Sequence, residues 1–181
     1  MKKVLYVITL FIVATVNVNA QDWIDYKSEE LAFISEFPNE PERTTQDLES
    51  DIGNLQLHMI MYSPPIDGDD ENEIYGVIRT TYPKSYFEDA DEAYNSNILD
   101  GAVEGAVTSV QGKLVFDNKI TFNGFPGRNI KIEIELGFIY MNAYLVENKM
   151  FISQVICLTN KDNNDSIKRF LNSFDILKVK E

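Results

Sequence analysis

The chain has few of the residues from which enzymes build reactive sites. Its 181 residues include one cysteine, one histidine and one tryptophan. Zinc sites are normally built from several His and Cys ligands, and neither HExxH nor CxxC occurs in the sequence. The phosphate-binding patterns GxGxxG and GxxxxGK[ST] and the serine motif GxSxG are also missing. These gaps argue against zinc catalysis, nucleotide binding through a phosphate loop and a serine-hydrolase site.

Basic residues are scarce as well. The chain has 16 Lys and Arg against 29 Asp and Glu, which gives a formal net charge of −13. Nucleic acids and anionic lipid headgroups are both bound through basic surfaces, so we expect neither as a partner. A hydrophobic content of 44% and an aromatic content of 12% are typical of a globular protein. The length favours one domain with a core of its own.

The one long apolar run lies at the N-terminus. Lys2 and Lys3 precede the apolar residues 4–16, and Val18-Asn19-Ala20 follows them with residues that a signal peptidase accepts. The run is short for a transmembrane helix. The sequence therefore predicts a cleaved signal peptide over residues 1–20 and a mature domain over residues 21–181. The alternative is an uncleaved anchor.

Cleavage after Ala20 predicts a secreted or periplasmic protein with no membrane insertion afterwards. No cysteine lies near this position, so we do not expect a lipoprotein. Loss of Lys2 and Lys3 would leave the mature chain two charges more negative than the precursor.

The lone cysteine and the lone histidine are the two candidate reactive groups. An exported protein with a single cysteine has no internal disulfide, and Cys157 lies in an apolar, strand-like run. We interpret Cys157 as a small buried hydrophobic residue and His58 as a surface or partly packed imidazole. The alternative is a nucleophile at Cys157, or a catalytic or ligand role for His58.

Two groups of acidic residues suggest chemistry at first sight. The segment Asp67 to Glu73 could hold Ca²⁺, but the EF-hand pattern fails, with Asn72 at position six and Ile78 at position twelve. We expect a solvated acidic loop, and whether it binds a cation stays open. Glu133 and Glu135 alternate with isoleucines, which indicates the polar face of a half-exposed strand rather than a glycosidase pair.

Most of the chain has the pattern of β-strands joined by short turns. Alternating or β-branched runs predict strands at residues 31–37, 55–62, 74–82, 129–136, 138–146 and 150–159. Residues 113–122 predict one strand or a short hairpin broken at Asp117-Asn118. Residues 38–50 are polar and contain two prolines, so they predict a loop or a weak edge strand. Residues 123–128 predict a turn, and residues 176–179 a short final strand.

Two segments have helical spacing. The first carries small residues such as Gly101 and Gly105 at three- and four-residue intervals, which predicts a helix packed closely on a sheet. Ser85 and Glu88 fit a capping box at its start, although the start could lie a few residues later, and the helix should end by residues 111–112. The second helix is predicted from the apolar residues Ile167, Phe170, Leu171 and Phe174. Its expected cap is Asp162 or Asn163.

This order of elements predicts an α+β fold, with a central antiparallel β-sheet and helices packed on it. The sequence also resembles the PsbP-like family over residues 24–179. That family includes the PsbP subunit of the photosynthetic oxygen-evolving complex and many small exported bacterial proteins. The resemblance rests on the small-faced first helix and on three motifs: Phe33-x-x-x-Phe37-Pro38-x-x-Pro41, Gly124-x-Pro126-Gly127-Arg128 and Phe170-Leu-Asn-Ser-Phe174.

The resemblance implies an α/β/α sandwich and a role in binding or assembly, with no catalytic residues to carry over. It does not imply a photosystem role. We therefore expect an exported, non-enzymatic domain that binds a partner protein or a small ligand in the cell envelope, through one sheet face or residues 63–73. We expect no cofactor and no metal site. The alternatives are a small hydrolase-type enzyme with a dispersed site at His58 or Cys157, and a structural or stress protein without a ligand. The oligomeric state stays open.

Overall fold

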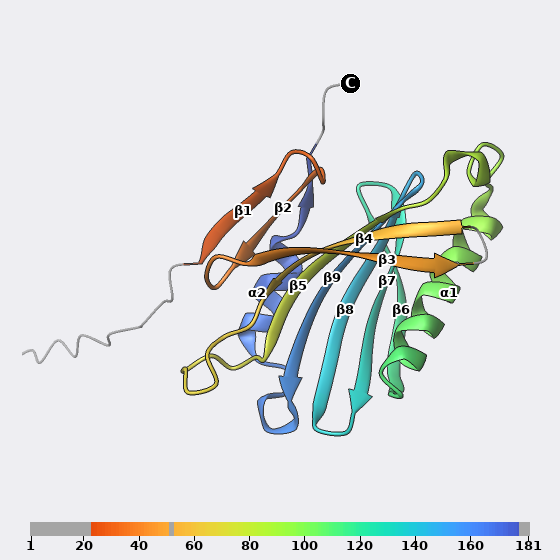
Figure 1. The fold of residues 1–181 in the computed structure, drawn as a ribbon. Coiled ribbons are helices and arrows are strands. Elements are labelled where there is room, and N and C mark those ends of the chain that lie inside the picture. The colour runs from red at the N-terminus through yellow and green to blue at the C-terminus, as the bar shows by residue number, and fades with distance from the viewer. Residues whose placement is uncertain (1–22, 51–52, 178–181) are drawn as a thin grey trace, which may run out of the picture.

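The strands form two antiparallel sheets (Figure 1), in a computed structural model that describes residues 23–50 and 53–177. The main sheet has seven strands in the spatial order β3 (Glu42–Ser50), β4 (Gly53–Tyr62), β5 (Ile74–Thr81), β9 (Lys149–Leu158), β8 (Gly137–Val146), β7 (Phe125–Ile134) and β6 (Lys113–Phe122). The small sheet has the order β1 (Ile24–Ser28), β2 (Phe33–Phe37) and β10 (Asp175–Ile176). Short 3₁₀ turns lie at Lys84–Tyr86 and Thr159–Lys161.

The two faces of the main sheet are covered by different elements. Helix α1 (Glu92–Ser109) packs over β7 and β8, and we call this side the α1 face. Helix α2 (Asp165–Ser173) and the small sheet pack on the other side, which we call the α2 face. The result is a layered α+β fold with a central antiparallel sheet, which confirms the fold class predicted from the sequence.

The core of the α2 face is largely aromatic. Phe170 of α2 packs edge to face on Phe37 of the small sheet and on Tyr75 of β5, with ring centroids 5.0 Å and 5.3 Å away. All three side chains are fully buried. Trp23 adds an edge-to-face contact with Tyr75 at 5.4 Å. These rings join α2, the small sheet and the main sheet into one hydrophobic cluster.

The core of the α1 face uses aliphatic residues, and the predicted face of its helix is buried only in part, at Ile98, Ala102 and Ala106. Leu99 and Val103 are the buried residues of α1. Gly101 and Gly105 are exposed, and a Cβ atom added to either would meet nothing within 4 Å. The expectation that these glycines pack against the sheet is therefore wrong. The larger apolar side chains one or two positions away bury more surface, and they set the orientation of the helix.

Both helix caps also differ from the prediction. Asp91, rather than Ser85, caps α1 by accepting a hydrogen bond from the backbone N–H of Tyr94. Asn164 caps α2 through the backbone N–H of Ile167, so neither Asp162 nor Asn163 does so. In each case a side-chain oxygen meets an amide that the first helical turn leaves unpaired.

Several strand boundaries are refined by the structure. Residues 38–50 contain the edge strand β3 from Glu42 onward, so the weak-edge-strand interpretation is confirmed and the loop interpretation is wrong. The turn expected at residues 123–128 is shorter, since β7 begins at Phe125. Lys131, expected on a polar face, is buried.

The expected signal peptide at residues 1–20 and Val179 of the expected final strand lie outside the described residues. Among residues 23–50 and 53–177, no helix is both long and apolar enough to cross a membrane.

Candidate functional site

Part of the α1 face carries apolar side chains that no helix covers. Helix α1 packs over β7 and β8, whereas Leu57, Met59 and Met61 of β4 point to the same side of the sheet at the far end of the strand order. Met59 lies opposite Ile78 of β5 in the strand register. These four side chains are half-buried and belong to none of the three core clusters. This half-buried apolar strip continues the sheet face that α1 covers elsewhere.

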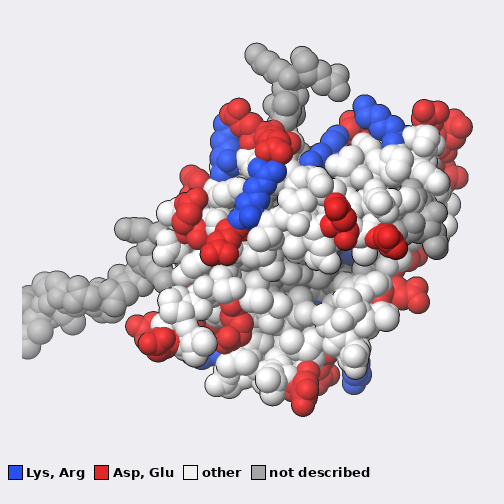
Figure 2. Space-filling model, viewed as in Figure 1, with Lys and Arg blue, Asp and Glu red and all other residues white. Residues whose placement is uncertain are grey.

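The surface around this strip is hollowed. In Figure 2 the region between the edge strand β3 and α1 is recessed and mostly uncharged, with acidic side chains at its rim. Gly76 of β5 leaves room for Met61, since a Cβ atom there would lie 2.4 Å from the Met61 sulfur. A pocket of about 280 Å³ opens at Met61, with Glu40 and Glu42 in its lining. We call the strip and this pocket the methionine groove.

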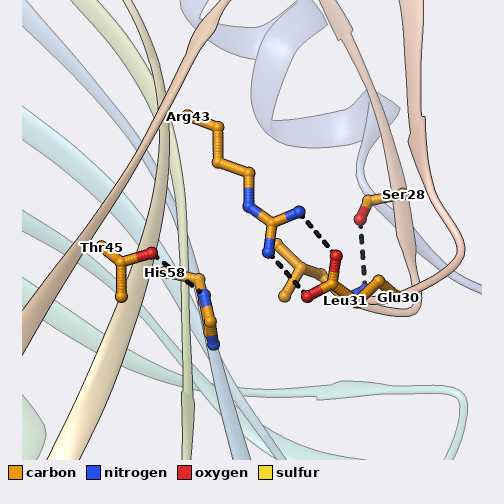
Figure 3. A network of polar contacts seen from close by, with 6 residues as sticks. All are labelled: Ser28, Glu30, Leu31, Arg43, Thr45 and His58. Carbon is orange, nitrogen blue, oxygen red and sulfur yellow. Dashed lines mark hydrogen bonds and ion pairs between the residues drawn. The ribbon is translucent and has the colours of Figure 1, made fainter.

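A polar cluster lies on the α2 face (Figure 3). The strand register places Thr45 of β3, His58 of β4 and Arg79 of β5 in one row across the sheet. Glu30, in the turn between β1 and β2, accepts hydrogen bonds from both terminal nitrogens of Arg43, at 2.7 Å and 2.8 Å. Thr45 Oγ1 lies 3.5 Å from His58 Nδ1, at the outer limit of a hydrogen bond. The turn of the small sheet therefore reaches Arg43 of β3, two residues before Thr45 at one end of this row.

Electrostatics sets the protonation of His58. Burial lowers the pKa of His58 below its ordinary value, and the nearby Arg43 and Arg79 lower this pKa further. The Arg43 guanidinium holds the pKa of Glu30 below its usual range. The site at neutral pH therefore contains one carboxylate, two guanidinium groups and a neutral imidazole.

This arrangement predicts a loss of stability in mild acid. The unfolded chain takes up a proton at its imidazole near the ordinary pKa of about 6.5, while folded His58 resists protonation. The contribution of His58 to stability is therefore complete above about pH 6.5 and is lost as the pH falls through the lowered folded pKa. We expect urea denaturation between about pH 7 and pH 5 to show a smaller loss in His58→Gln than in the wild type. Equal losses in both proteins would contradict this assignment.

The structure does not bring His58 and Cys157 together. His58 aligns through Arg79 with Phe151, and Cys157 lies six residues further along β9, about 20 Å away along the strand. Cys157 is buried. Burial, and to a lesser degree Asp162, raise the pKa of its thiol. The thiol is therefore kept protonated and out of reach of the imidazole.

The acidic loop has a structural contact that the sequence did not suggest. Asp70 accepts a hydrogen bond from the hydroxyl of buried Tyr75 at 2.6 Å and from the backbone N–H of Asn72 at 2.9 Å. Asn72 is also buried, and its side chain accepts a hydrogen bond from Asn164, the cap of α2. The loop is thus fastened to the core and to α2. No group of three or more metal-binding side chains occurs within the part of the chain that the structure describes.

A partly buried ion pair lies on the same strand as Glu133. Lys131 donates hydrogen bonds to both carboxylate oxygens of Asp162 at 2.8 Å, and Asp162 also accepts one from the hydroxyl of Tyr140. The Lys131 ammonium lies 3.9 Å from the ring centre of Phe138. This network explains why Asp162 does not cap α2: its carboxylate is held by the sheet. Glu133 and the neighbouring Glu135 are exposed.

Known proteins resemble this chain in structure rather than in sequence. No family model and no curated protein matches the chain. Among solved structures, the solution structure of cyanobacterial PsbP (CyanoP) from Synechocystis sp. PCC 6803 is similar, with a TM-score of 0.53 and 9% sequence identity. The match covers 88% of this chain and 95% of that chain. The chain therefore has a PsbP-like fold, as its sequence motifs predicted.

Proposed function

We propose that this chain is an exported, non-enzymatic binding domain of the PsbP type, which holds a partner protein in the cell envelope through the methionine groove. The segment of the partner that fits this groove is apolar and carries positive charge. The observation that supports the proposal is the half-exposed strip of Leu57, Met59, Met61 and Ile78 beside α1.

The apolar character of the groove favours a binding role. A sheet face that no helix covers normally carries polar side chains, because water solvates it. Here the strip continues the apolar pattern of the covered half, so its burial by a partner would be favourable. Methionine side chains are flexible and polarizable, and they adapt to differently shaped apolar partners.

Charge defines the partner further. Glu40 and Glu42 line the pocket at Met61, and the whole chain carries a net charge of −13. Such a surface attracts a basic segment and repels an acidic one, and this selectivity acts mainly on the rate of association.

The alternative, a hydrolase with a dispersed site at His58 or Cys157, has less support. The thiol of Cys157 is buried and its pKa is raised, whereas nucleophilic cysteines are partly exposed and have a lowered pKa. His58 has two arginines and Glu30 around it, and no nucleophile at hydrogen-bond distance among the described residues other than the Thr45 hydroxyl at 3.5 Å.

The test uses the methionine methyl groups as reporters in the mature chain. A synthetic amphipathic peptide of leucine and lysine is titrated into protein labelled at its methionine methyls, with a leucine–glutamate peptide as the matched probe. We expect saturable NMR shifts at Met59 and Met61 with the basic peptide. Met150 is buried on the same face, so its methyl should shift much less. The Ile78→Glu variant should weaken binding at least tenfold, about 1.4 kcal/mol.

Leu136→Glu is the control variant, because Leu136 is 71% exposed in the turn between β7 and β8, outside the groove. Equal binding of the acidic and basic peptides, or equal loss in Ile78→Glu and Leu136→Glu, would overturn the proposed surface.

A further inference from the structure

Arg79 differs from the other arginines of the protein. The chain contains four arginines, and Arg43, Arg128 and Arg169 each form an ion pair with a carboxylate. No described residue accepts a hydrogen bond from the Arg79 guanidinium, and its Nε atom is fully buried. In a chain with 29 acidic residues, an arginine without a carboxylate partner in the described structure is unexpected.

The position of Arg79 makes this arrangement unfavourable for the free protein. The side chain is half-buried in the middle of the main sheet, between His58 and Phe151 in the strand register. Burial lowers the pKa of Arg79, which reflects the loss of hydration around its charge. A buried donor without a partner lowers stability. The terminal nitrogens of Arg79 are not among the fully buried atoms, so a ligand that accepts hydrogen bonds from them would offset part of the lost hydration.

The neighbouring acid does not serve as this partner. Glu30 attracts Arg79 electrostatically, but both of its carboxylate oxygens accept hydrogen bonds from Arg43. The register neighbours of Arg79 are His58 of β4 on one side and Phe151 of β9 on the other, Thr45 of β3 follows beyond His58, and Glu30 acts on Arg79 electrostatically. The imidazole of His58 and the hydroxyl of Thr45 can donate further hydrogen bonds to a small anion.

We propose that Arg79 binds a carboxylate group of a ligand, with His58 beside it in the row and Thr45 beyond His58. The planar guanidinium matches the two oxygens of a carboxylate. A single charge is favoured over a doubly charged phosphate, because Glu30 lies beside the site and the protein is strongly acidic. This site lies on the α2 face, opposite the methionine groove, so it does not depend on the proposed function.

The test is an NMR titration of the full mature chain with sodium acetate, at constant ionic strength set with sodium chloride. The Nε–Hε resonance of Arg79 should shift in a saturable way, while that of Arg169 should not. Arg79→Gln should lower the acetate affinity at least tenfold. The ring resonances of His58 should follow the same binding curve, because the imidazole lies beside Arg79 in the row.

Arg169→Gln is the matched control, since Arg169 is an arginine on the same side of the sheet whose guanidinium already pairs with Glu36. Inorganic phosphate above pH 7.5 is the second probe, and we expect it to bind more weakly than acetate. A linear, non-saturating shift at Arg79, equal shifts at Arg79 and Arg169, or tighter binding of phosphate would each overturn the carboxylate site.

Discussion

The Phe170→Ala variant is expected to lose about 4 kcal/mol of unfolding free energy. Phe170 is fully buried where α2 meets both sheets, and its ring contacts Phe37, Tyr75 and Trp23. Alanine would leave a cavity at the point where three elements meet, and these elements cannot all move inward to fill it. Two edge-to-face ring contacts would be lost with the side chain.

Urea denaturation followed by tryptophan fluorescence measures this loss directly. Trp23 is the one tryptophan of the chain and packs against Phe170 itself, so its emission reports on this core. Ile66→Ala is the control, because Ile66 is fully exposed in the loop between β4 and β5. That variant should change stability by no more than about 0.5 kcal/mol. A Phe170→Ala loss as small as this would mean that the aromatic cluster is not a packed core.

Arg128→Ala is the second large effect, with an expected loss of about 3 kcal/mol. Arg128 of β7 pairs with Asp117 of β6 and with Asp100 of α1, and its side chain is only 12% exposed. These bonds hold the pKa of Arg128 above its ordinary value. Removing the guanidinium leaves the carboxylate of Asp117, 17% exposed, without its cation.

Hydrogen exchange distinguishes this loss from a general weakening. Arg128 joins α1 to the sheet through Asp100, so amides of α1 should exchange faster in Arg128→Ala than those of β8 and β9. Lys27→Ala is the control, since the Lys27–Glu29 pair is exposed and should contribute less than about 1 kcal/mol. Equal effects of the two substitutions would show that the Arg128 cluster is no more important than a surface pair.

The order of helices and strands could be predicted because it depends on local patterns. Alternating apolar residues and short turns signal antiparallel strands, and the spacing of Ile167, Phe170 and Leu171 signals the last helix. The orientation of α1 could not be predicted in the same way. Alanines and glycines occur on several sides of this helix, so small residues alone do not identify the side that faces the sheet. Packing of the larger Leu99 and Val103 against the sheet determines that side.

The candidate sites depend on contacts between distant parts of the chain. The register of β3, β4 and β5 aligns Thr45, His58 and Arg79 in one row. Glu30, which binds Arg43, belongs to a turn of the other sheet. Asp162 does not cap α2 as expected, because its carboxylate accepts hydrogen bonds from Lys131 of β7 and Tyr140 of β8. The one signal in the sequence was the unusually apolar pattern of β4, where both faces carry large hydrophobic residues.

The two edges of the main sheet limit how the protein can assemble. Among the described strands, β3 and β6 each have a hydrogen-bonded neighbour on one side only. The edge strand β3 carries mostly charged and polar side chains, with Leu48 as its one large apolar residue, and the pairing of β6 with β7 is interrupted by an irregularity between Leu114 and Phe116. Both features oppose the addition of another strand and hence growth into fibres. Both edges of the main sheet are therefore poorly suited to pairing with a further strand, so the partner proposed above would have to dock against side chains on a face of the sheet.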